Sequence, residues 1–89
     1  MDSICQPFEL PAKLDAGSVP QLIQALLEHR HRPILVDASD VELISTLCIQ
    51  VLLSARKCWQ GDGLSFAIEN PSPAFRDSVT LLGAKILLQ

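Results

Sequence analysis

Three stretches of the chain carry apolar residues at the spacing of an amphipathic helix. The first is expected to begin at Ser18, with Gln21 three residues later in the capping-box position, and to end near His31. The second is expected to begin at Ser45 or Thr46, where a hydroxyl side chain suits the N-cap, and to run to about residue 59. We expect each helix to bury one apolar side against the rest of the domain.

The third helical stretch lies near the C-terminal end of the sequence. Ser72 and Pro73 supply an N-cap and a first-turn proline, and Gly83 supplies a stop. The residues expected on its buried side are Phe75, Val79 and Leu82.

Short apolar segments between these helices are predicted to form strands. The segments cover residues 8–10, 12–14, 34–36, 64–68 and 85–88. Pro11 separates the first two, which is typical of an edge strand or a bent strand because proline cannot donate a hydrogen bond to a neighbour. Strands that alternate with helices predict an α/β sandwich, with a small, mixed but mostly parallel sheet and about three helices mainly on one face.

Composition and charge narrow the class of protein. The chain has 89 residues, of which 48% are hydrophobic and 19% charged, and this indicates one globular domain over residues 1–89. Its 7 basic residues and net charge of −3 exclude a nucleic-acid module that binds by neutralising phosphates. No apolar run reaches the roughly 18–20 residues that a membrane span needs. The first residues lack the basic and apolar parts of a signal peptide, so we expect a cytoplasmic domain.

Sequence motifs of enzymes are absent. The 4 glycines are scattered singly, so neither a phosphate-binding loop nor a nucleophile elbow can be assigned. Asp37, Asp40 and Glu42 gather around one turn, where paired acids could hold a metal or transfer protons. We interpret them as a solvated acidic loop, because Asp commonly stabilises turns through local hydrogen bonds. The sequence therefore predicts a binding module that is not an enzyme and holds no cofactor.

The cysteines and histidines form no recognisable disulfide or metal pattern. Cys5, Cys48 and Cys58 are odd in number and far apart, so we expect small buried side chains. His29 and His31 lie two positions apart, which on a helix directs the rings to different sides. We predict no metal site.

The start of the second helix is one candidate for binding chemistry. Ser45 and Thr46 place hydroxyl groups beside the free amide groups of the first turn. A side-chain oxygen there caps the helix, and a phosphate group there would also be favoured. A plain N-cap explains these residue types without phosphorylation, so both interpretations stay open.

The apolar surface of the same helix is the other candidate. One stripe comprises Leu47, Val51, Ala55 and Cys58, and further apolar residues beside it are Ile49, Leu52 and Leu53. A helix with this much apolar surface either lies deep in the core or offers a docking surface. Whether this flank forms a homodimer is also open.

Residues 34–53 resemble the STAS domain family, the fold of bacterial anti-sigma factor antagonists. Like that family, they combine an apolar strand ending in Asp37, a short polar turn and a hydroxyl-bearing helix start. Leu14 and Asp15 match the family's usual Leu-Asp pair, and residues 61–83 match its later elements. The resemblance extends from about Phe8 to Ile86 and implies a STAS-like fold.

The resemblance also implies a functional site in the first turn of the second helix. By position, the family's phosphorylated serine falls on Thr46, and its preceding aspartate falls on Ser45. Leu47 replaces the second serine and Cys48 replaces the glycine; the loss of the aspartate and the glycine removes groups that shape the loop around the acceptor. The predicted residues near this site are Asp15, Asp37 and Ser45.

A regulatory protein-binding module, acting in signal transduction by partner switching, is the function that the resemblance implies. The predicted docking residues are Asp40, Glu42, Leu47, Ile49, Gln50 and Leu53. The expected partner is a serine-kinase-like anti-sigma factor, or a histidine kinase or other chemotaxis component, because residues 48–53 resemble small STAS proteins of alphaproteobacterial chemotaxis systems. An alternative is a constitutive subunit of a larger complex, for example a lipid-transport ATPase, in which Thr46 is only a helix cap. Small-molecule or nucleotide sensing is a third hypothesis.

Overall fold

The computed structural model describes residues 7–88. The elements in chain order are β1 (Pro7–Glu9), β2 (Lys13–Leu14), the 3-10 helix η1 (Ala16–Ser18), α1 (Val19–Glu28), β3 (Ile34–Asp37), β4 (Leu43–Ile44), α2 (Thr46–Gly61), β5 (Phe66–Glu69), α3 (Pro73–Leu81) and the 3-10 helix η2 (Lys85–Leu88). Cys5 lies outside the described residues, so its burial stays a prediction.

The strands form two small parallel sheets. One has the order β1-β3-β5, and its register places Phe8, Val36 and Ile68 side by side. The other joins β2 to β4, with Leu14 opposite Ile44. Every described pair is parallel, as expected when each connection between paired strands contains a helix. The predicted α/β class with a mostly parallel sheet and three helices is confirmed.

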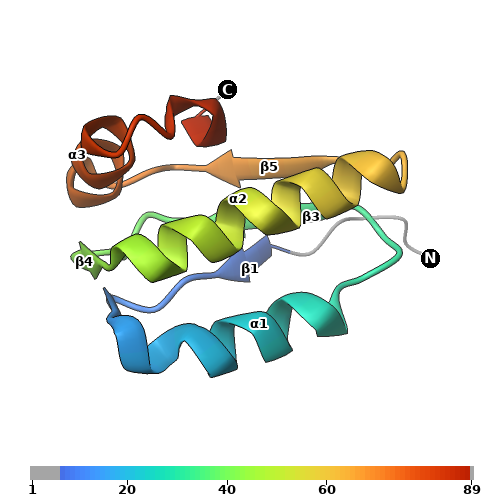
Figure 1. Cartoon of the computed structure of the whole chain (residues 1–89), viewed down its shortest axis with the longest axis horizontal. Helices are drawn as coiled ribbons and strands as arrows, with labels where there is room; N and C mark the ends of the chain where they lie inside the picture. Colours follow the sequence, from blue (N-terminus) through green and yellow to red (C-terminus); the bar gives the residue numbers. More distant parts are fainter. Residues whose placement is uncertain (1–6, 89) are drawn as a thin grey trace.

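Helices α1 and α2 lie side by side in front of the three-stranded sheet, while α3 and η2 lie at the β5 side (Figure 1). Both α1 and α2 run in the same direction, so their N-terminal ends lie at one end of the molecule (Figure 1). On β3, Ile34 and Val36 are buried in the core and Leu35 between them is half-buried, as the alternation of a strand requires. One side of α2 joins the same core through Cys48, Ile49, Leu52, Ala55 and Trp59.

Two of the three predicted helix caps are confirmed. The Ser45 hydroxyl accepts a hydrogen bond from the Cys48 amide at 3.2 Å. The buried Ser72 hydroxyl accepts one from the Phe75 amide at 3.1 Å and donates one to the Val41 carbonyl at 2.6 Å. Each cap satisfies an amide that the first helical turn leaves without a partner.

The predicted capping box at Ser18 is wrong. A 3-10 turn over Ala16–Ser18 precedes α1, and the Ser18 side chain accepts no capping hydrogen bond. Its hydroxyl instead donates to the Asp15 carboxylate at 3.2 Å. Helix α1 ends at Glu28, slightly before the predicted end, and His31 adopts a left-handed φ of 71° in the turn that leads to β3.

The predicted final strand is also wrong, because residues 85–88 form the 3-10 helix η2. Leu87 is buried in the core, whereas Ile86 is exposed. Leu82 is exposed as well, because α3 ends at Leu81 and the chain turns at Gly83, whose φ is 71°. The strand at 64–68 is shifted to β5 (Phe66–Glu69), and β4 was not predicted.

A candidate docking site at the start of helix α2

The start of α2 is tied to the end of β2 by two contacts. The Ser45 amide donates a hydrogen bond to the Leu14 carbonyl at 2.7 Å. The buried Cys48 thiol lies 3.4 Å from the Asp15 carbonyl and donates to it. Because these segments are about thirty residues apart in the chain, the tertiary fold rather than local sequence brings Asp15 to the start of α2.

Thr46 is the first residue of α2, and its side chain is exposed. Ser45 forms the side-chain cap of the helix. Within residues 7–88, no hydrogen bond engages the Thr46 hydroxyl. The sequence did not decide which of these two residues is the N-cap, and the structure assigns that role to Ser45. The Thr46 hydroxyl is therefore accessible at a helix N-terminus, where an anion is favoured.

The two predicted acids near this site have different surroundings. Asp15 is exposed and precedes η1. Asp37 ends β3, and its carboxylate accepts a hydrogen bond from the Ser39 amide at 2.9 Å. That hydrogen bond lowers the pKa of the Asp37 carboxyl below its ordinary value, because it stabilises the charged form. No hydrogen bond in the described part of the chain joins either acid to Thr46.

The predicted docking residues divide by exposure. Asp40, Glu42, Leu47 and Gln50 are exposed, and Leu53 is half-buried. Ile49 is 1% exposed and belongs to the core, so it offers no surface to a partner. Leu43, which the sequence did not single out, is 53% exposed, because in β4 it points outward while Ile44 points inward. The alternation of an outward Leu43 and an inward Ile44 was the sequence signal for this exposure. A strand of two residues is too short to recognise from the sequence.

The structure divides the apolar residues of α2 between the core and the surface. Five residues of this helix lie in the core, and the exposed Leu47 and Cys58 lie on a different side with the half-buried Val51. The expectation that the cysteines are buried is therefore confirmed for Cys48 and wrong for Cys58.

Two searches of the described residues gave no candidates. Over residues 7–88, no group of three or more His, Cys, Asp or Glu side chains could hold a metal ion. None of the helices described for this chain is long and apolar enough to cross a membrane.

Comparison with known proteins agrees with the geometry. A family model described as "Mlab, STAS domain" matches residues 2–89. No curated protein gives a significant match to the chain. The parallel strands and the hydroxyl-bearing start of α2 agree with the resemblance, whereas only α1 and α2 of the three predicted helices lie together on one face and α3 lies at the β5 side (Figure 1). Because the match covers nearly the whole sequence, this chain belongs to the STAS domain family.

Proposed function

We propose that this domain is a regulatory protein-binding module that docks on a protein partner through the start of α2, and that phosphorylation of Thr46 releases the partner. STAS domains are regulatory modules that mediate protein–protein interaction. The observation that carries the proposal is the exposed Thr46 hydroxyl, which takes no part in capping because Ser45 performs that role.

The structure supports a switch that leaves the fold intact. A phosphate on Thr46 would add a charge of about −1.5 to −2 at a helix N-terminus, where the macrodipole stabilises it. The same charge inside a docked interface would be desolvated and unpaired, which costs about 2–5 kcal/mol. That cost lowers the affinity for the partner by about 30- to 4,000-fold.

The side chains around Thr46 define what the partner must offer. Leu43 and Leu47 are about half exposed and provide apolar contact. Asp15, Asp40 and Glu42 are exposed acids on the adjoining segments, so a partner with basic residues around an apolar patch fits this surface. The partner class that we propose is a serine-kinase-like anti-sigma factor or a histidine kinase of a chemotaxis system, in the cytoplasm.

A second candidate is a constitutive subunit of a larger complex, such as a lipid-transport ATPase. The observation that favours it is Cys48, which stands where the family has a glycine and is completely buried, with its thiol on the Asp15 carbonyl. This packing ties the Asp15 segment to the first turn of α2. In this case Thr46 is never modified.

The test compares wild type with Thr46→Glu and Thr46→Val in affinity capture from the native cell extract. Thr46→Val keeps the shape and adds no charge, so it is the matched control. We expect a kinase or chemotaxis component to be captured by wild type and Thr46→Val and lost with Thr46→Glu. Intact mass of the protein from its native host should show a species about 80 Da heavier, the mass of one phosphate.

Equal capture of the same complex by all three proteins, without the heavier species, would contradict the switch and support the constitutive subunit. Urea unfolding of Thr46→Glu provides the necessary control for folding, and we expect a change within about 0.5 kcal/mol.

A further inference from the structure

The β3–β4 loop, residues 38–42, carries two of the predicted docking residues. Within it, Ala38 is 0% exposed and Val41 is 2% exposed. Asp40 and Glu42 are exposed, one on each side of Val41. Because Val41 is fixed in the core, the direction in which the two acids are presented depends on the backbone around Val41.

The peptide unit between Val41 and Glu42 is held at both ends by short hydrogen bonds. The Ser72 hydroxyl donates to the Val41 carbonyl at 2.6 Å. The Glu42 amide donates to the Ala12 carbonyl at 2.7 Å. Ser72 is the N-cap of α3, and Ala12 directly precedes β2, so these two partners come from segments far apart in the chain. The tertiary fold therefore sets the orientation of this peptide unit.

Ser72 contacts the same loop a second time through its own backbone. Its amide donates to the Ala38 carbonyl at 3.1 Å, so one residue holds both Ala38 and Val41. Its hydroxyl also accepts a hydrogen bond from the Phe75 amide at 3.1 Å. A helix cap requires only the last of these three hydrogen bonds. The other two act on the β3–β4 loop.

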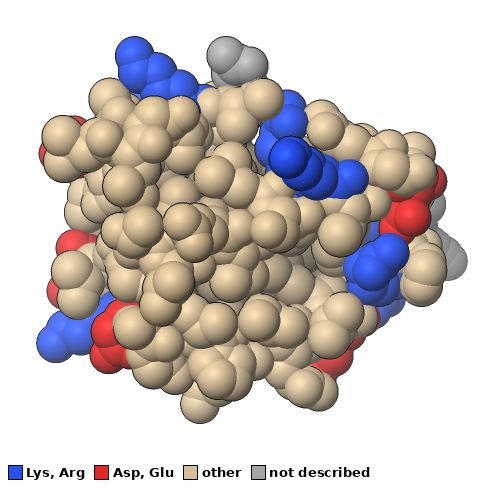
Figure 2. All heavy atoms as spheres, viewed as in Figure 1, with Lys and Arg blue, Asp and Glu red and all other residues tan. Residues whose placement is uncertain are grey.

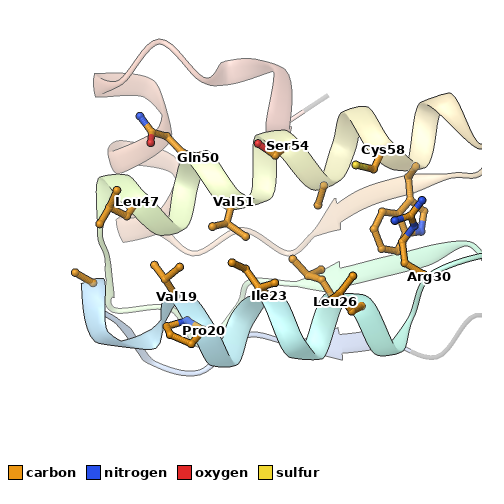
Figure 3. Close-up of a pocket in the computed structure, with 14 residues that line it drawn as sticks. Val19, Pro20, Ile23, Leu26, Arg30, Leu47, Gln50, Val51, Ser54 and Cys58 are labelled. Carbon is orange, nitrogen blue, oxygen red and sulfur yellow. The ribbon is translucent and has the colours of Figure 1, made fainter.

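The face formed by α1 and α2 offers little charge to a partner. The groove between the two helices has apolar walls, where Ile23 and Val51 point toward each other (Figure 3). The middle of this face carries no Lys, Arg, Asp or Glu side chain, and charged side chains lie toward its outline (Figure 2). At the start of α2, by contrast, Asp15 and the acids of the β3–β4 loop are exposed. A partner that recognises the domain by charge must therefore contact this end.

We propose that Ser72 is a positioning residue for partner docking, which holds the β3–β4 loop so that Asp40 and Glu42 meet a basic partner in one arrangement. This role rests on the proposed function, because it concerns the same docking surface. A loop that is already ordered loses less conformational entropy when a partner binds, so buried Ser72 raises the affinity without touching the partner. Removal of its hydroxyl deprives the Val41 carbonyl of its donor and frees the peptide unit to turn.

Amide hydrogen exchange of the full chain, followed residue by residue by NMR, tests the positioning without a partner. We expect Ser72→Ala to accelerate exchange of the Glu42 amide about 10-fold more than that of the Leu52 amide in the core part of α2. Ser72→Thr keeps the hydroxyl and should restore the wild-type ratio. Val79→Ala is the matched control, because it weakens the buried side of α3 and leaves the Ser72 hydroxyl in place. In this control the Glu42 amide should accelerate no more than the Leu52 amide.

Affinity capture from the native cell extract tests the consequence for docking. Ser72→Ala should retain at least about 10-fold less of the protein that wild type captures, whereas Ser72→Thr and Val79→Ala should retain it. Equal acceleration of the Glu42 and Leu52 amides in Ser72→Ala would overturn the proposal, as would undiminished capture by that variant. A wild type that captures no protein would overturn the proposed function itself. Intact wild-type capture without these differences would overturn only the role of Ser72.

Discussion

The two ends of α2 differ in how their side chains are held. At its first turn, Thr46 is exposed and its hydroxyl is unengaged, with a single cap from Ser45. At its last turn, the Trp59 side chain is 2% exposed and its indole N–H donates to the Arg32 carbonyl at 2.8 Å. The Arg30 guanidinium lies over the same ring, 5.7 Å from its centroid. At the last turn the side chain singled out is a buried ring with its own hydrogen bond, whereas at the first turn the exposed Thr46 side chain can change its chemistry at little cost to the fold.

Removing the ring at the last turn should have the largest effect. We expect Trp59→Ala to lower the free energy of unfolding by about 3–5 kcal/mol, because it empties a large part of the core and removes the contact with Arg30. Trp59→Phe keeps most of the ring and should lose less. Urea unfolding measures both. A loss below about 1 kcal/mol for Trp59→Ala would show that this end of α2 does not hold the domain together.

Substitutions at the first turn sharpen the comparison. Ser45→Ala should cost about 1 kcal/mol of stability, because the Cys48 amide loses its side-chain acceptor. Thr46→Ala should stay within about 0.5 kcal/mol, because its hydroxyl has no partner to lose. Thermal and urea unfolding of the two variants side by side would settle the assignment. Equal losses would mean that both residues share the cap.

A smaller effect is expected from the ion pair at the last turn. The Arg30 guanidinium and the Asp62 carboxylate are 3.0 Å apart, and both side chains are 31% exposed. Asp62→Ala should therefore destabilise the domain by less than about 1 kcal/mol, and 1 M salt should reduce the difference further. An effect as large as that of Trp59→Ala would show that the charge rather than the ring anchors this end.

A shift to acid pH should have the smallest effect on stability, and it acts through Asp37, one of the acids predicted to lie near Thr46. The hydrogen bond from Ser39 lowers the pKa of Asp37 in the folded protein, so this carboxylate adds stability above its unfolded pKa. That contribution disappears as the pH falls through the lowered pKa. Stability curves of wild type and Asp37→Asn should therefore differ slightly at neutral pH and converge in strong acid. Parallel curves over the whole range would contradict this.

Local sequence signals predicted most of the element order. Ser72 and Pro73 correctly predicted the start of α3, because helix capping depends on a few adjacent residues that the sequence shows directly. Residues 85–88 were wrongly predicted as a strand because a short apolar run has no diagnostic period. The 3-10 helix η2 depends on the fold as a whole, which places Leu87 in the core and leaves Ile86 exposed.

The candidate site was less predictable than the fold. The resemblance identified the position of Thr46, but the sequence did not show whether Ser45 or Thr46 caps α2. That assignment depends on the backbone at Ser45, which the Leu14 carbonyl holds in place from a distant segment. Ile49 was wrongly predicted as a docking residue for the same reason. Its apolar side chain suits a docking surface, but the tertiary fold places it in the core. The groove depends on the separation of α1 and α2, which has no local signature.

The parallel strand pairing has a consequence for the rate of folding. Every described strand pair joins residues about thirty positions apart, and none is a local hairpin, so each pairing must first close a long loop. Folding should therefore be slower than that of a helical bundle of the same length. Since β3 is the middle strand, it has both neighbours only after β5 has been synthesised. A nascent chain that ends before Phe66 exposes an unpaired strand edge, and during synthesis this edge is a site where newly made copies can associate wrongly.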